Sequence, residues 1–161
     1  MYKIRVILDT KKDVIRTFLI DKKVNLEELH FIIAKNFGFN GQEMASFYRT
    51  DIDWNQGEEI PLFDMADAGT DTSMASCFLT ETLPLENDKL IYVYDFLHLW
   101  TFYVEVIEIT DKTVENLPKL ILSVGEIPEE APEKEFKAEK LDGELDEDED
   151  DFYDEYDFNE Y

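Results

Sequence analysis

The sequence predicts an α+β fold, in which one main helix packs across an antiparallel or mixed β-sheet and a disordered acidic C-terminal tail follows. Three features carry this prediction. Two β-rich runs open the chain, a strongly signalled amphipathic helix follows them, and the most apolar stretch, residues 89–109, is rich in β-branched and aromatic residues. The domain therefore opens with the order β-hairpin, helix, strand.

The opening hairpin is predicted from YKIRVIL (2–8) and VIRTFLI (14–20), which are joined by the polar connector DTKKD. In the first run, apolar residues alternate with Lys3 and Arg5, so one face of the strand is directed to a core and the other to solvent. A connector of this length is typical of an antiparallel hairpin.

The segment VNLEELHFIIAKNFGF (24–39) carries the signals of a helix with defined ends. Asn25 is a suitable N-cap, and Glu28 stands three residues later, as in a capping box. Gly38 supplies the left-handed conformation that ends a helix. The apolar residues that recur at the helical period predict one buried stripe, formed by Leu26, Leu29, Ile33 and Phe37.

The middle of the chain gives weaker signals. EMASFYRT (43–50) is predicted as a third strand, and EEIPLF (58–63) as a short edge strand, because Pro61 has no N–H to donate to a central ladder. Residues 64–77 show no sustained period and are predicted to be a surface loop. Residues 78–88 have room for one helical turn.

The apolar stretch is predicted to form two strands, Lys89–Phe96 and Trp100–Ile109, with a bend at Leu97–Leu99. Asp95 then lies at a strand end, where its carboxylate can accept backbone amides. A last strand over 117–124 completes a globular domain of residues 1–124. Residues 125–161 are predicted to be an acidic linker and tail, disordered because like charges repel.

Charge is distributed very unevenly along this chain of 161 residues, which has a formal net charge of −24. Residues 129–161 have a net charge of −14, whereas the first 23 residues have a net charge of +4. A surface of this charge repels nucleic-acid phosphates and anionic lipid. Binding to DNA over the whole surface is therefore not expected.

Other features of the composition indicate a cytoplasmic protein. Cys77 is the only cysteine, so no internal disulfide and no paired-cysteine zinc or redox site is predicted. The N-terminus lacks the apolar core of a secretory signal, and Asp95, Glu105 and Glu108 make insertion of the apolar stretch into a bilayer costly. We expect no membrane contact and no cofactor, and the oligomeric state is left open.

Two motifs resemble those of the plasmid open-reading-frame-three-like family of small bacterial domains. Its LxELHxxIxxxFGF-type helix is matched by NLEELHFIIAKNFGF (25–39), and its YxYDFGDxW-type hairpin by IYVYDFLHLW (91–100). The likeness spans roughly residues 2–124. It implies a compact α+β domain found near mobile elements, with no established biochemical activity.

The chain departs from the family pattern at the tip of the second motif. Leu97 and His98 replace the usual Gly-Asp pair, and Phe102 stands where a histidine is expected. The cysteine- and glycine-containing segment that often ends such domains is represented only by SVGEIPEEAP (123–132). Any polar site that these positions build in the family is weakened here.

The second motif nevertheless supplies the candidate ligand-binding residues Tyr94, Asp95, His98 and Trp100. A strand-end carboxylate beside amphipathic rings can line a cleft. In the alternative interpretation, Asp95 ties the bend and the rings fill the core. His30 and His98 are the two histidines available for acid–base or metal chemistry, but they share no motif, so no catalytic residue is assigned.

No metal site is predicted. The run DIDWNQGEE (51–59) mimics a calcium loop, with Asp51, Asp53 and Asn55 at alternating positions. However, its glycine falls one residue late, at Gly57, and Leu62 occupies the twelfth position, where a bidentate glutamate is needed. A solvated loop is the simpler interpretation.

The tail is the strongest candidate for an interaction, because aromatic residues punctuate its acids. These candidate partner-binding residues are Phe152, Tyr153, Tyr156, Phe158 and Tyr161. The leading hypothesis is a non-catalytic interaction module whose tail docks on a basic protein surface. A first alternative is a weak nucleic-acid-binding domain whose basic N-terminal hairpin is masked by the tail. A second alternative is an enzyme with a site around Asp95, His98 and Trp100.

Overall fold

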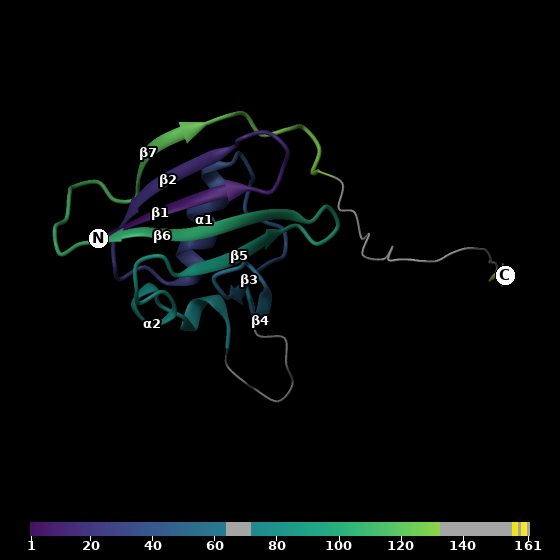
Figure 1. Ribbon diagram of the computed structural model, residues 1–161, viewed down its shortest axis with the longest axis horizontal. Coiled ribbons are helices and arrows are strands. Elements are labelled where there is room, and N and C mark those ends of the chain that lie inside the picture. Colours follow the sequence, from purple (N-terminus) through teal and green to yellow (C-terminus); the bar gives the residue numbers. More distant parts are fainter. Residues whose placement is uncertain (64–71, 133–155, 158, 161) are drawn as a thin grey trace.

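The computed structural model describes residues 1–63, 72–132, 156–157 and 159–160. Its main feature is a seven-stranded sheet with the order β4-β3-β5-β6-β1-β2-β7, in which every neighbouring pair is antiparallel (Figure 1). The strands are β1 (Tyr2–Leu8), β2 (Ile15–Ile20), β3 (Ala45–Thr50), β4 (Gln56–Pro61), β5 (Lys89–Tyr94), β6 (Trp100–Ile109) and β7 (Lys119–Val124). The predicted α+β class is confirmed, and the sheet is antiparallel.

One main helix, α1 (Leu26–Asn36), covers one face of the sheet. Its capping box has formed: the Asn25 side chain accepts a bond from Glu28 N at 2.8 Å, and Glu28 Oε1 accepts one from Asn25 N at 3.1 Å. Gly38, at φ +85°, ends the helix in the left-handed conformation. These local signals explain why the predicted helix ends are close to the observed ones.

The core lies between α1 and the inner face of the sheet. Alternate residues of β1 and β6 face inward, and the predicted helix stripe meets them with side chains that are at most 2% exposed. Aromatic rings link the layers, with Phe37 against Phe102 at 4.7 Å and Phe47 against Tyr92 at 4.8 Å between centroids. Each such fully buried side chain contributes roughly 1.5–3 kcal/mol.

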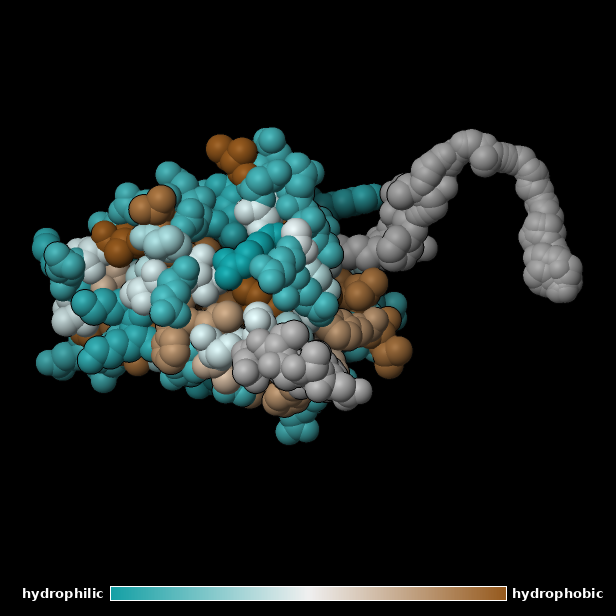
Figure 2. Space-filling model, turned by 90° about the horizontal axis from the view of Figure 1, so that it is seen from below, coloured by the Kyte–Doolittle hydropathy of each residue, from teal (hydrophilic) through white to brown (hydrophobic). Residues whose placement is uncertain are grey.

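Four short elements complete the described part of the chain. They are the 3₁₀-helix η1 (Met74–Ser76), the helix α2 (Leu79–Thr82) and a parallel pair of strands, β8 (Tyr156–Asp157) and β9 (Asn159–Glu160). Residues 64–71 of the predicted surface loop over 64–77 lie outside the described residues, and the prediction is wrong at Met74, whose side chain is fully buried. On the side where β4 and α2 lie, hydrophilic residues predominate and hydrophobic ones form small groups (Figure 2).

Two strands differ from their predicted bounds for backbone reasons. β5 ends at Tyr94 instead of Phe96, because Asp95 adopts φ +67° and leaves the extended conformation. β7 begins at Lys119, after Pro118, which has no N–H to donate to the ladder. β4 lies at the sheet edge, as Pro61 predicted.

Part of the predicted tail lies outside the described residues. This applies to the expected disorder over 133–155 and to four candidate aromatic residues, Phe152, Tyr153, Phe158 and Tyr161. Of the fifth, Tyr156, only its place in β8 is described. Beyond β7, Ile127 and Ala131 still pack against the core.

Candidate functional site

The bend between β5 and β6 is built around Asp95. β5 and β6 pair up to Tyr94 and Trp100, and residues 95–99 connect them. The Asp95 carbonyl accepts bonds from His98 N at 3.0 Å and Leu99 N at 2.6 Å, while its Oδ1 accepts one from Leu97 N at 3.1 Å. The carboxylate therefore ties the bend, as its position at a strand end predicted.

The second carboxylate oxygen of Asp95 holds His98. Oδ2 lies 2.7 Å from Nδ1 of the imidazole, and the Asp95 side chain is 14% exposed against 62% for His98. The bond to Asp95 orients the ring, so that the other ring nitrogen, Nε2, points away from the carboxylate. The result is a carboxylate–imidazole pair that stands on a rigid bend.

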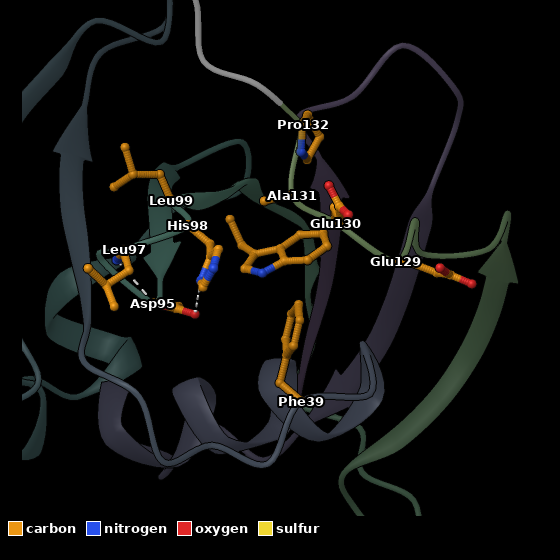
Figure 3. A pocket seen from close by; sticks show the side chains of 10 residues that line it. Phe39, Asp95, Leu97, His98, Leu99, Glu129, Glu130, Ala131 and Pro132 are labelled. Atoms are coloured by element: carbon orange, nitrogen blue, oxygen red, sulfur yellow. Dashed lines mark hydrogen bonds and ion pairs between the residues drawn. The ribbon is translucent and has the colours of Figure 1, made fainter.

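This pair lines a cleft of about 720 Å³ between the bend and the segment after β7 (Figure 3). Phe39 and Trp100 form its aromatic wall, with 5.0 Å between their ring centroids. Phe39 also stacks on Tyr94, with 4.7 Å between the centroids. Phe39 follows the glycine that ends α1, which places it at this end of the sheet. Phe39 closes the helix motif NLEELHFIIAKNFGF, but it was not among the predicted ligand-binding residues.

Residues 125–132 follow β7, and we call this segment the strap; its last four residues, 129–132, form the opposite wall of the cleft. It leaves β7 at Gly125, which has φ +78° and lies so close to the β1–β2 turn that a Cβ atom would stand 2.0 Å from the Asp13 carbonyl oxygen. Only glycine fits both conditions. From there the strap crosses to the bend, with Ile127 and Ala131 packed on the core (Figure 3).

The cleft is acidic. Asp95, Glu129 and Glu130 line it, His98 is the one group there that can gain positive charge, and the lining contains neither lysine nor arginine. In Figure 3, Glu130 stands above the cleft and Glu129 points along the strap, away from His98. Carboxylates around aromatic faces favour a cationic ligand. Glu129 and Glu130 had been predicted only as linker residues.

The four predicted ligand-binding residues thus fall into two groups. Asp95, His98 and Trp100 line the cleft. Tyr94 lies beneath it, 2% exposed, with its hydroxyl accepting a bond from Gly41 N at 3.1 Å and donating one to Asn40 Oδ1 at 3.1 Å. Tyr94 therefore supports the Phe39 ring from below.

His30 belongs to the core and is fully buried. Its Nδ1 lies 2.5 Å from the Tyr92 hydroxyl, while its Nε2 has no hydrogen-bond partner among the described residues. Burial lowers the pKa of His30 to about 4. The backbone of Gly41 has a smaller effect in the opposite direction. His30 is held as a neutral ring, separate from the exposed His98.

The calcium-like loop is closed by its own hydrogen bonds. The Asp51 carboxylate accepts bonds from Asn55 Nδ2 at 3.0 Å, Asn55 N at 3.0 Å and Asp53 N at 2.9 Å. The hydrogen bonds from the side chain and backbone of Asn55 contribute most to lowering the pKa of Asp51, and the bond from Asp53 N contributes less. Within the described ranges, no three His, Cys, Asp or Glu residues are grouped to hold a metal ion.

The basic residues of the opening hairpin do not form one patch. Arg5 pairs with Glu105 at 2.8 Å and Lys3 with Glu108 at 3.7 Å on the outer face of the sheet. Arg16 turns inward, donating bonds to Ile15 O and Val124 O, both at 2.9 Å.

Two lysines of the hairpin remain at its turn. Lys11 and Lys12 line a hollow of about 1010 Å³ together with Glu126 and Glu129 of the strap. Strap carboxylates thus lie beside the turn and reduce its positive potential. This arrangement weakens the case for a nucleic-acid site on the hairpin.

Comparisons with known proteins give a family and a fold. The family model described as plasmid pRiA4b ORF-3-like protein matches residues 1–161, which confirms the resemblance read from the two motifs. The crystal structure of the protein of unknown function MM3350 from Methanosarcina mazei Go1 is similar, with a TM-score of 0.60 and 16% identity over 76% of this chain and 67% of that one. None of the curated proteins compared with the chain matches it. Across the described residues, no helix combines the length and apolarity needed to cross a membrane.

Proposed function

The chain belongs to the plasmid pRiA4b ORF-3-like protein family. We propose that it is a non-catalytic interaction module that binds a basic segment of a partner protein. The observation that carries the proposal is the cleft between the bend and the strap, which Asp95, Glu129 and Glu130 line together with the rings of Phe39 and Trp100. A cytoplasmic setting and an association with mobile elements are part of the same proposal.

The chemistry of the cleft suits a lysine or arginine side chain. A guanidinium or ammonium group over an aromatic face gains roughly 0.5–2 kcal/mol, depending on how far it is desolvated. Glu129 and Glu130 add charge attraction from the strap. Because both glutamates belong to a surface segment, we expect them mainly to raise the association rate and to make binding depend on salt.

The acidic tail extends this surface. Residue 133 follows the last cleft residue, Pro132, and residues 142–161 contain 12 acids and no basic residue. A basic partner held in the cleft would therefore meet the tail as well. Under this proposal, the tail aromatics supply additional anchors once the partner has bound.

Titration calorimetry with a peptide rich in lysine and arginine tests the proposal. We expect binding that weakens steeply as salt is raised, and no binding of an acidic peptide of equal length. Changing Glu129→Gln and Glu130→Gln together should weaken binding about 2- to 30-fold, from roughly 0.2–1 kcal/mol for each exposed charge.

The matched control changes Glu81→Gln and Glu115→Gln, two exposed glutamates outside the cleft. This control removes the same net charge and should leave the affinity within 2-fold of the unchanged protein, by the small effect of distant screened charges. Equal weakening by both pairs would show that only overall charge matters and would reject the cleft as the binding site.

A second candidate function is catalytic, and the Asp95–His98 pair favours it. With Nδ1 held by a carboxylate, the imidazole Nε2 could accept a proton from a bound substrate or water. The test is a screen of chromogenic esters, amides and phosphoesters with the unchanged protein and with His98→Gln. Turnover that is absent, or equal in both proteins, rejects this candidate.

A further inference from the structure

A second hollow lies on the outer face of the sheet, which α1 does not cover. Its volume is about 300 Å³, enough for one aromatic side chain, and its apolar lining comes from Met1, Leu19 and Ile121. Lys3 and Lys112 also line it, with Glu108, which pairs with Lys3 at 3.7 Å, so these three side chains leave a net charge of +1. In a chain whose net charge is −24, this hollow is a local basic site.

β7 extends the hollow into an apolar surface. The register of β2 and β7 shifts between Thr17 and Phe18, which leaves Ile121 as an extra residue of β7. Ile121 lies against Leu19 in the hollow, and Leu122 and Val124 continue along the strand with 46% and 38% of their surface exposed. The bulge also makes β7 a poor edge for pairing with a further strand. The face of the sheet is therefore the better docking surface.

We propose that this outer-face hollow holds the aromatic part of the chain's own C-terminal tail, residues 152–161. The tail offers aromatic rings that can fill the apolar pocket and flanking carboxylates that can pair with Lys112. A tail bound there shields apolar surface and reduces the repulsion among the tail acids. The inference does not depend on whether the cleft binds a basic partner.

The length of the tail fits the distance it must span. The described chain reaches Pro132 at the end of the molecule opposite to Met1 (Figure 1). The cleft that Pro132 lines lies at the Trp100 end of β6 and the hollow lies at its Ile109 end, so the separation is about the length of this ten-residue strand, roughly 33 Å. A flexible linker of the length between Pro132 and Phe152 has an r.m.s. extent of about 25 Å, and the repulsion among its acids extends it further. Local concentration is greatest when these two lengths agree.

Spin labelling of the full chain tests the proposal. With Cys77→Ser and Asn159→Cys, a nitroxide on the tail should broaden the backbone amide signals of Leu19 and Ile121 and leave those of the bend at Leu97 sharp. Broadening that is absent, uniform over the surface or strongest at the bend would overturn the proposal.

Two matched pairs of variants identify the contacts. Lys112→Glu should abolish most of the broadening, whereas the same change at the opposite end of the sheet, Lys11→Glu, should leave it unchanged. In the tail, Phe152→Ser with Tyr153→Ser should reduce the broadening, and Leu145→Ser should not. Equal effects within either pair would contradict the proposed contacts.

A mixed sample separates the tail's own chain from a second copy. Spin-labelled chain without ¹⁵N is mixed with ¹⁵N-labelled chain without the label. No broadening should appear in the mixture at low protein concentration. Broadening of the same magnitude as in the singly labelled chain would show that the hollow takes the tail of another molecule, which contradicts docking within one chain.

Discussion

Protonation of His30 should destabilise the folded protein as the pH falls. Burial lowers the pKa of His30 from 6.5 to about 4. Between these two values the unfolded chain binds the proton and the folded chain does not, so stability is full above pH 6.5 and is lost progressively on acidification to pH 4. The shift corresponds to about 3 kcal/mol, at 1.36 kcal/mol for each pKa unit.

The structural cause is the bond between His30 and Tyr92. A neutral imidazole can accept the Tyr92 proton at Nδ1, and the two atoms lie 2.5 Å apart. A protonated imidazole would instead donate at both nitrogens and leave the hydroxyl hydrogen without its acceptor. Its charge would also be buried without a carboxylate partner among the described residues.

Urea unfolding at pH 7.5 and pH 4 measures this effect in the unchanged protein and in His30→Gln. Because the carboxylates titrate in both proteins, the difference between the two pH dependences isolates His30. We expect the unchanged protein to lose about 3 kcal/mol more than the variant. Equal losses, or an NMR titration of His30 with a midpoint near 6.5, would refute the reasoning.

Three further changes test the fold around the site. Gly125→Ala should cost at least about 2 kcal/mol, because a Cβ atom meets the Asp13 carbonyl at φ +78°; urea unfolding with a loss below 0.5 kcal/mol would contradict the close crossing of the strap. Glu105→Gln should cost about 1–3 kcal/mol, because Arg5 and Lys89 lose their shared partner. Burial raises the pKa of Glu105, but hydrogen bonds from Arg5 and Lys89 outweigh this and lower it, so the stability from Glu105 is lost as the pH falls through the acid range. A pH dependence unchanged in the variant would reject this role. Asn25→Ala should cost about 1 kcal/mol and Asn36→Ala distinctly less, because only the first removes the N-cap.

Local features of the sequence predicted the elements whose causes are local. The capping box of Asn25 and Glu28 and the stop at Gly38 act within a few residues, and both are present in α1. The hairpins were predictable because alternation and short polar connectors determine pairing between neighbours in sequence. The role of Asp95 at the bend was predictable for the same reason, because the Leu97 amide that its carboxylate binds is two residues away.

The cleft depends on contacts between residues far apart in the chain, and these were not predictable. Phe39 meets Trp100 because the sheet places β6 beside the end of α1, and the strap lies opposite the bend because it crosses the hairpin at Gly125. No periodicity or spacing encodes such approaches. Met74 was missed for the same reason, since a single buried residue in an irregular segment leaves no pattern.

The two tryptophans provide the most direct measurement of where a basic partner binds. Trp100 lines the cleft, whereas Trp54 packs against Tyr103, 5.0 Å away between centroids, outside it. On adding a lysine- and arginine-rich peptide to the ¹⁵N-labelled full chain, we expect the indole N–H signal of Trp100 to shift and that of Trp54 to stay in place. A shift of Trp54 with Trp100 unchanged, or no shift of either at a concentration where the peptide binds, would contradict the proposed cleft.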